Sequence, residues 1–219
     1  MPEVRADADR IVADAAALGV VLEVGQAEML LRFADLLLRW NRAFNLISRR
    51  DTGRLVTRHL LDSLSIAPWL VGTEVMDLGT GAGLPGVPLA IARGDAQFTL
   101  IDRSERKIRF IDQVIRALGL GNVSSWCGDV RALPPEAIYD TVVCRAVAGV
   151  ADVWALAGGH IRPGGRMLVM HRGQSPSSRA EHDPPAELAG GVLHQRVEVR
   201  VPGLQYPHEL VVLDRTGPE

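Results

Sequence analysis

The stretch that decides the fold is Val75-Met76-Asp77-Leu78-Gly79-Thr80-Gly81-Ala82-Gly83-Leu84-Pro85-Gly86. Its first part is an apolar strand and its second part a glycine-rich turn that opens a helix. Such a turn lies at the carboxyl edge of a sheet, where open α/β folds bind their ligands. Glycine leaves the backbone bare, so a ligand can touch it directly. A plain turn does not need four glycines in eight positions, and we therefore predict that this turn holds a ligand.

Working outward from this turn, short apolar runs alternate with amphipathic segments, which is the pattern of a parallel sheet with right-handed crossovers. Strands are predicted at 74–78, 97–101, 123–127, 141–144, 166–170, near 192–201 and at 209–213. Between the second and third strands, Ser104 is the predicted N-cap of a helix that Gly119 ends. A polar loop from Gln174 to Pro185 and a short helix precede the last two strands, whose pairing turns the sheet edge antiparallel.

Residues 1–72 are predicted to form an N-terminal helical cap, and residues 73–219 the ligand-binding domain. Large apolar residues recur at steps of three and four between Ala27 and Phe44, which indicates an amphipathic helix. A second helical register runs from Arg54 to Leu70. The predicted fold class is α/β: a Rossmann-like domain with a mostly parallel seven-stranded sheet, helices on both faces and an N-terminal helical extension.

Composition narrows the class of protein further. The chain has 219 residues, of which 47% are apolar, enough for a substantial core. Its two cysteines, Cys127 and Cys144, lie in apolar runs, so neither disulfides nor a metal site is expected. No run approaches the roughly 18 apolar residues of a membrane helix, and the polar start differs from a signal peptide. We expect a soluble, cytoplasmic monomer without metal.

The net charge of -2 conceals a basic stretch, because residues 39–58 contain six arginines and one aspartate. Such a stretch is either a solvated face or a phosphate-binding surface. The arginines are Arg39, Arg42, Arg49, Arg50, Arg54 and Arg58.

Two ligands suit the glycine turn, a dinucleotide and S-adenosylmethionine. Residues 81–86 satisfy the dinucleotide pattern G-x-G-x-x-G, which is weak evidence alone. Asp102 ends the second strand, where either ligand needs a carboxylate for its ribose. Asp77 discriminates between them, because a carboxylate two residues before Gly79 attracts an ammonium and a sulfonium and repels a pyrophosphate. The charge pattern favours S-adenosylmethionine.

Two further strand ends fit this ligand. Gly128-Asp129-Val130-Arg131 follows the third strand, where backbone groups and an acid can read an adenine edge. The fourth strand ends in Cys144-Arg145-Ala146, which puts a cation at the mouth of the site. A salt bridge from Arg145 to Asp129 or Asp140 is the structural alternative. Cys144 is interpreted as a small buried hydrophobe, and a covalent nucleophile is its alternative.

At this point the chain resembles a known family, the GidB or RsmG type ribosomal RNA methyltransferases. The resemblance covers roughly residues 30–215 in the family's order. The segments that carry it are Trp40-Asn41-Arg42-Ala43-Phe44-Asn45-Leu46, Arg58-His59-Leu60-Leu61-Asp62-Ser63-Leu64, residues 77–88, Cys144-Arg145-Ala146 and Glu209-Leu210-Val211-Val212. It implies an S-adenosylmethionine-dependent enzyme that methylates N7 of a guanine in the 530 loop of 16S ribosomal RNA, with that RNA or the small ribosomal subunit as partner.

Carried over by position, the resemblance also implies which residues act. The residues implied to bind the cofactor are Gly79, Gly81, Leu84, Asp102, Val130, Arg131 and Arg145. Arg145 is also the candidate catalytic residue. The candidates for binding RNA are Asn41, Asn45, Arg58, His59 and Arg172. Many members have Lys-Gly after the fifth strand, whereas this chain has His171-Arg172-Gly173, which makes the role of Arg172 less secure.

The reaction that the resemblance implies does not require a general base from the protein. Guanine N7 carries no proton, so the reaction needs no general base and depends on positioning and charge. Three alternatives stay open at this stage: a small-molecule methyltransferase, an NAD-type oxidoreductase and a non-catalytic nucleotide sensor. Asn41 and Asn45 can equally be helix caps, and His59 can equally bridge helices.

Overall fold

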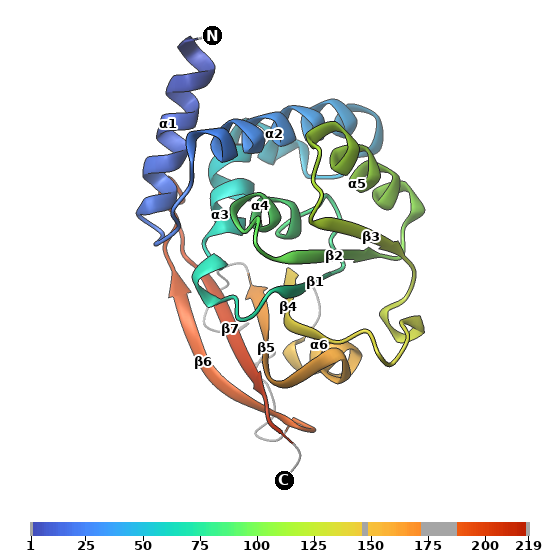
Figure 1. The fold of residues 1–219 in the computed structure, drawn as a ribbon. Helices are drawn as coiled ribbons and strands as arrows, with labels where there is room; N and C mark the ends of the chain where they lie inside the picture. Colours follow the sequence, from blue (N-terminus) through green and yellow to red (C-terminus); the bar gives the residue numbers. More distant parts are fainter. Residues whose placement is uncertain (1, 146–148, 172–187, 218–219) are drawn as a thin grey trace.

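The computed structural model describes residues 2–145, 149–171 and 188–217, and within them the chain builds one seven-stranded sheet (Figure 1). The strand order is β3-β2-β1-β4-β5-β7-β6. The strands are β1 (Glu74–Leu78), β2 (Gln97–Asp102), β3 (Val123–Cys127), β4 (Tyr139–Arg145), β5 (Ile161–His171), β6 (Gly191–Val199) and β7 (His208–Arg215). Strands β1 to β5 pair in parallel, and β7 runs antiparallel to β5 and β6. The predicted α/β architecture with an antiparallel edge is confirmed.

Helices cover both faces of this sheet. The main helices are α1 (Pro2–Ala16), α2 (Val24–Phe44), α4 (Gly86–Ala92), α5 (Glu105–Leu118) and α6 (Val150–Ala157). Helices α2, α4 and α5 lie on one face and α6 on the other (Figure 1). The predicted helix 27–44 and the helix between Ser104 and Gly119 are both confirmed, and Gly119 takes the left-handed conformation that ends α5. The predicted loop 174–185 and the short helix after it lie outside the described residues.

The segment predicted as one helical register from Arg54 to Leu70 is irregular. It consists of the 3-10 turn η1 (Arg49–Arg54), the π-helical turn η2 (Val56–Leu61), the short α3 (Asp62–Leu64) and the 3-10 turn η3 (Ala67–Trp69). Ser63 and Ser65 donate their hydroxyls to the carbonyl oxygens of His59 and Asp62, both at 2.6 Å. Side chains that bond to the backbone in this way compete with regular helix formation. The result is a tightly wound, buried segment with polar side chains inside.

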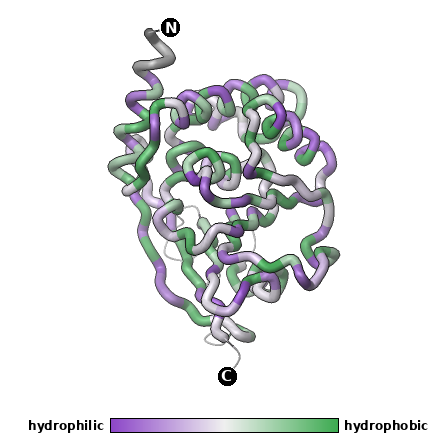
Figure 2. Tube along the Cα trace, in the orientation of Figure 1, coloured by the Kyte–Doolittle hydropathy of each residue, from purple (hydrophilic) through white to green (hydrophobic). Residues whose placement is uncertain are grey.

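Alternation along the strands separates the core into two layers. In β1, Val75 faces the layer under α2, α4 and α5, whereas Met76 faces the layer under α6. Leu100 and Ile101 of β2 divide in the same way. This period of two is what a sheet buried on both faces requires. The outer helices alternate between hydrophilic and hydrophobic residues along their length, as α2 shows in Figure 2.

The N-terminal helices share their core with the sheet. Phe33 and Trp40 of α2 contact Phe110 of α5, with ring centroids 6.4 Å and 5.5 Å apart. Gln26 donates to the carbonyl oxygen of Ile91 in α4 at 2.8 Å. The division of the chain at residue 72 stays a prediction, but these contacts fix α2 against α4 and α5 on one face of the sheet.

Candidate functional site

The register of the sheet brings three of the predicted site residues to one edge. Leu78 of β1 pairs with Ile101 of β2 and with Cys144 of β4. The next residues along the three strands are Gly79, Asp102 and Arg145, and parallel strands end at the same edge. The glycine turn, the predicted ribose acid and the predicted catalytic cation therefore lie side by side, as the sequence implied.

The glycines of the turn divide into two kinds. Gly79 has φ +71° and Gly81 φ +60°, a region that favours glycine, and a Cβ built on Gly79 would meet no heavy atom within 4 Å. In contrast, a Cβ on Gly83 would lie 2.7 Å from Val87 Cγ2, and one on Gly86 would lie 2.6 Å from Asp77 Oδ2. The first two glycines thus leave the backbone open, and the last two permit close packing of α4.

Asp77 lies beneath this turn and is completely buried. Its Oδ2 accepts hydrogen bonds from Thr80 Oγ1 at 2.7 Å and from the Gly86 N–H at 2.8 Å. Its Oδ1 has no hydrogen-bond partner among the described residues. Burial raises the pKa of Asp77 to about 6, although the two hydrogen bonds and the charge of Arg145 oppose that rise. Asp77 therefore orders the turn through Oδ2, and its Oδ1 is a buried acceptor beneath the turn that no described donor reaches.

This arrangement argues against a pyrophosphate at the start of α4. Anions bind at helix N-termini through free N–H groups. Here the Gly86 N–H is bonded to the Asp77 carboxylate, and the Val87 N–H to the carbonyl oxygen of Gly83 at 2.8 Å. A second anion at this position would meet a carboxylate instead of free donors. A cationic group meets no such penalty at the same place.

Asp102 is almost fully buried at the end of β2 and holds several loops together. Its Oδ2 accepts from the Gly81 N–H at 3.0 Å and from Lys107 Nζ at 3.1 Å, and its Oδ1 accepts from the Ser104 N–H at 2.9 Å. A carboxylate has about four acceptor positions. One position remains for a hydroxyl group. Ser104 stands at the predicted N-cap of α5, but its side chain makes no capping hydrogen bond.

The segment predicted to read adenine is a short turn after β3, η4 (Val130–Ala132). Val130 is buried, and the Arg131 N–H is bonded to Asp129 Oδ1 at 3.0 Å. Asp129 also accepts from the Arg131 guanidinium and lies 2.6 Å from Arg103 Nη2. These contacts hold the pKa of Asp129 well below its usual range. The cofactor contact expected of Arg131 stays a prediction, and its backbone donor is engaged within the turn.

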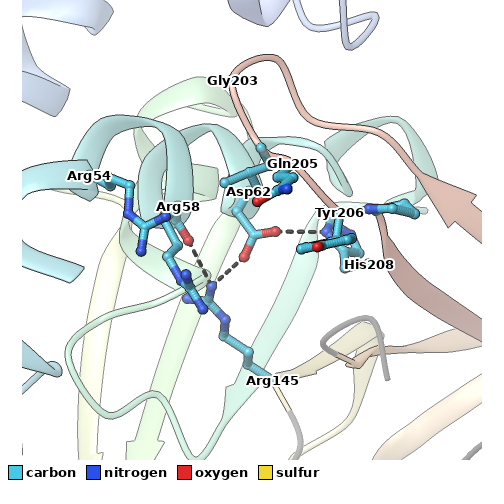
Figure 3. A pocket seen from close by; sticks show the side chains of 10 residues that line it. Arg54, Arg58, Asp62, Arg145, Gly203, Gln205, Tyr206 and His208 are labelled. Carbon is cyan, nitrogen blue, oxygen red and sulfur yellow. Dashed lines mark hydrogen bonds and ion pairs between the residues drawn. The ribbon is translucent and has the colours of Figure 1, made fainter. Parts of the chain in front are cut away.

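Arg145 is the centre of a polar network that joins three parts of the chain (Figure 3). Its Nη2 donates to a carboxylate oxygen of Asp62 and, at 3.1 Å, to the carbonyl oxygen of Arg58. The other oxygen of Asp62 lies 2.7 Å from Nδ1 of His208 on β7. The expected alternative partners, Asp129 and Asp140, are not the ones found. Arg145 and Asp62 have side chains only 17% and 9% exposed, so the pair is strongly held.

The network extends from Arg145 into the cap through His59. Arg145 Nη1 lies 3.3 Å from His59 Nδ1, and His59 Nε2 lies 3.8 Å from Asp51 Oδ2. Because a guanidinium only donates, the contact with Arg145 is a hydrogen bond when His59 Nδ1 carries no proton. Asp51 also accepts from Arg58 Nε at 3.1 Å. His59 therefore has a structural role, as the alternative reading expected, but it connects the cap to β4 and not one helix to another.

Burial and ion pairing act in opposite directions on Asp62. Burial raises its pKa, but the hydrogen bond with His208 and the charge of Arg145 outweigh burial and leave the pKa below its usual value. Asp62 is consequently ionised at neutral pH and a weak base. Neither Asp62 nor His208 was predicted from the sequence. Asp62 lies in a quoted motif, but only the fold brings the three residues together.

A pocket of about 260 Å³ opens beside this network. The cap contributes Arg54, Arg58 and Asp62, β4 contributes Arg145, and the connection between β6 and β7 forms the remaining wall (Figure 3). That wall consists of Gly203, Leu204, Gln205, Tyr206 and Pro207, together with His208 at the start of β7. Of the predicted RNA-binding residues, Arg58 lines this pocket. Three arginines against one aspartate make it an anion-attracting site.

The other predicted residues have local roles in the structure. Asn41 is buried and its Oδ1 accepts from the Ile47 N–H at 2.8 Å, while Asn45 ends α2 in the left-handed conformation. These are the capping roles that the sequence left open, and RNA contacts through them stay predictions. Leu84 is buried under the glycine turn. Arg172 lies outside the described residues.

Cys144 is buried, and its environment suppresses ionisation. Burial, together with the charge of Asp77, raises the pKa of Cys144 to about 12. The thiolate is the nucleophilic form of cysteine. Cys144 is therefore not a nucleophile at neutral pH, in agreement with its interpretation as a small hydrophobe. The described residues contain no helix long and apolar enough to span a membrane, and they form no cluster suited to a metal ion.

Comparisons with known proteins find relatives of this chain in sequence and in structure. The sequence model of the GidB family, described as rRNA small subunit methyltransferase G, matches residues 26–205. A ribosomal RNA small subunit methyltransferase G from Methylococcus capsulatus is 41% identical over 192 residues, which is 88% of this chain and 91% of that protein. Its counterpart from Xanthomonas euvesicatoria is 41% identical over 193 residues, 88% of each chain. In structure, a SAM-dependent methyltransferase from Aquifex aeolicus matches with a TM-score of 0.55 at 19% identity, over 74% of this chain and 93% of that one.

Proposed function

The chain belongs to the GidB family of rRNA small subunit methyltransferases, and from this premise we propose that it uses S-adenosylmethionine to methylate N7 of a guanine in the 530 loop of 16S ribosomal RNA. The observation that carries the proposal is the arrangement at the carboxyl edge. An open glycine turn over a buried acid stands beside Arg145, and Arg145 also lines an arginine-rich pocket. A site for a cationic donor and a site for a polyanion therefore meet at one residue.

The residues at the edge fit the proposed cofactor. The bare backbone of Gly79 and Gly81 admits a ligand, Asp102 keeps one acceptor position for a ribose hydroxyl, and Asp77 supplies negative charge beneath the turn. Val130 and Arg131 lie at the end of the neighbouring strand, on the side expected for adenine. When bound, S-adenosylmethionine supplies an electrophilic methyl group on a sulfonium. The chain's own contribution is to hold this group and exclude water.

The bases that line the pocket support guanine N7 as the acceptor atom. An efficient general base has a pKa near the working pH. Among the described lining residues, Asp62 has a lowered pKa and both ring nitrogens of His208 are buried. Arginine does not accept protons. A pocket of this kind suits a nucleophile that has no proton to lose, and guanine N7 is such an atom.

In this mechanism Arg145 positions the acceptor. Its guanidinium is fixed by Asp62, by the carbonyl oxygen of Arg58 and by His59. Such a rigid donor at the pocket wall can bond the guanine O6 atom, which neighbours N7. Preorganised donors cost no rearrangement during the reaction. His59 then acts through Arg145 and need not touch the RNA.

The basic stretch is the proposed docking surface for the rest of the RNA. Arg39, Arg42, Arg50 and Arg54 are exposed along the end of α2 and η1. Because phosphate contacts release counterions, the affinity for RNA should fall steeply with added salt, and a flat response would count against this surface. We expect the protein to act in the cytoplasm as a monomer.

The proposal is tested with small ribosomal subunits from a strain that lacks the gene. Purified protein and methyl-labelled S-adenosylmethionine are added, and the 16S RNA is mapped by mass spectrometry. The expected product is 7-methylguanine at one guanine of the 530 loop, formed by the wild type and not by Arg145→Ala. A methyl group on another atom, or unmodified RNA with the folded wild type, would refute the assignment. Protein-free RNA in a parallel arm distinguishes the two forms of substrate.

A further inference from the structure

The arginine-lined pocket contains residues that the proposed methyl transfer does not use. Arg145, Asp62 and His208 form its inner side, where they belong to the network described above. Arg54 and Tyr206 lie at its outer side, on η1 and on the connection between β6 and β7 (Figure 3). Neither side chain makes a hydrogen bond or an ion pair with another residue that the structure describes.

Arg54 differs from the two other arginines of the pocket. Arg58 is paired with Asp51, and Arg145 is paired with Asp62. The guanidinium of Arg54 makes no hydrogen bond or ion pair with any residue that the structure describes, and the residue is exposed. A free guanidinium beside two others matches the geometry of a phosphate group. Arg54 is therefore the cation of this pocket that is available to an external anion.

Tyr206 is 71% exposed, and among the described residues it is the one large aromatic side chain with such exposure. The segment that carries it is nevertheless fixed at both sides. His208, two residues later, is held by Asp62. Gly203, three residues earlier, packs so closely on η2 that a Cβ would lie 3.0 Å from Thr57 Cγ2. An exposed ring on an anchored segment is a platform on which a flat partner can stack.

The size of the pocket limits what it can hold. At about 260 Å³ it lies just below the range of about 300 to 1,000 Å³ that is typical of sites for small molecules. One nucleotide unit suits this volume better than a longer segment. Sequence-specific proteins recognise single-stranded RNA through splayed bases that stack on aromatic rings, with cations on the backbone. Tyr206 supplies the aromatic ring for a base, and Arg54 supplies the cation for a phosphate.

We propose that Arg54 and Tyr206 form a subsite for one unpaired nucleotide next to the methylated guanine, with Arg54 on its phosphate and Tyr206 stacked on its base. The inference rests on the proposed function in taking RNA as the substrate. It adds a contact that the motifs of the family resemblance do not include, because Tyr206 lies outside all of them. The role of this subsite is to place the guanine at Arg145.

The test is a binding experiment, which is independent of turnover. A fluorescein-labelled single-stranded RNA with unpaired guanines is titrated with the full chain, and its anisotropy gives the dissociation constant at several salt concentrations. Stacking of a base on an aromatic ring contributes about 1 to 3 kcal/mol, so Tyr206→Ala should weaken binding about fivefold or more. Tyr206→Phe keeps the ring and should bind as the wild type does. Arg54→Ala should lower the salt slope by about 0.7, the value of one phosphate contact on a single strand.

The matched controls are Arg116→Ala and Val21→Ala, which remove an exposed arginine from the last turn of α5 and an exposed apolar side chain from the cap. Both should leave the affinity and the salt slope unchanged. Unaltered binding by Tyr206→Ala, or equal losses in Tyr206→Phe and Tyr206→Ala, would overturn the subsite. If these losses appear but the wild type does not methylate 16S RNA, the subsite stands and the proposed function fails. If the wild type methylates its substrate and neither variant changes RNA binding, the proposed function stands and the subsite fails.

Discussion

The buried carboxylate beneath the glycine turn makes a quantitative prediction about stability. Asp77 is completely buried, and its pKa is raised from 3.8 to about 6 by that burial. The folded protein therefore holds this proton more tightly than the unfolded chain does. The stability that the protonated acid contributes is fully present below pH 3.8 and is lost as the pH rises through about 6. At about 1.4 kcal/mol per pKa unit, the loss amounts to about 3 kcal/mol.

The perturbation is Asp77→Asn, which keeps an acceptor for Thr80 and Gly86 and cannot ionise. The free energy of unfolding is measured by urea denaturation of both proteins between about pH 4 and about pH 7.5. Titrations of all other groups are common to both proteins and cancel in the difference. We expect the free energy of the variant minus that of the wild type to increase by about 2 to 3 kcal/mol over this range. Binding of S-adenosylmethionine, measured by calorimetry, should weaken in the variant because the negative charge is gone.

The control is Asp35→Asn, which replaces an exposed carboxylate on α2. Its difference from the wild type should not follow the same curve. A flat difference for Asp77→Asn would refute the reasoning, because the carboxylate would then not be charged in a buried position. A difference that falls with rising pH would mean that unseen donors stabilise the charged form.

Three further predictions concern the site and its frame. Gly86→Ala should lower the free energy of unfolding by about 1 to 3 kcal/mol, because its Cβ would lie 2.6 Å from a carboxylate oxygen. Gly79→Ala has space for its Cβ but a φ of +71°, so it should cost about 1 to 2 kcal/mol of stability and also reduce binding of S-adenosylmethionine in calorimetry. Asp62→Ala leaves the guanidinium of Arg145 buried without its main partner, which should cost about 3 kcal/mol or more in urea denaturation and abolish methylation; unchanged stability would show that the pair is not coupled. Cys144→Ala should keep the methylation rate near that of the wild type, and loss of all turnover in a folded variant would restore a nucleophilic role.

The sheet could be predicted from the sequence because local patterns encode it. Several strands carry a short apolar run, such as Met167–Met170 in β5 and Leu210–Leu213 in β7, and α2 and α5 carry stripes at helical spacing that persist for several turns. The ends of the strands then follow, and with them the placement of Gly79, Asp102 and Arg145 at one edge. These three residues meet because parallel pairing aligns the ends of strands that are distant in sequence.

The irregular segment 49–70 and the network around Arg145 could not be predicted in this way. The serines that bond to the backbone act locally, but which carbonyl oxygens they reach depends on burial against the sheet. The partners of Arg145 come from the cap and from β7, and no sequence spacing connects those segments. Asp129 and Asp140, the partners expected in the structural alternative, are closer to Arg145 in sequence. The fold selects Asp62 instead.

The position of β7 has a consequence during translation. This strand follows all other strands in the chain, yet it lies inside the sheet between β5 and β6 and supplies His208 to Asp62. A nascent chain that stops before residue 208 leaves the backbone of β5 open along one side, and open strand edges promote aggregation. Incomplete chains should thus be removed as insoluble material and not persist as weakly active enzyme, so a ribosome that stalls late in this message yields no functional product.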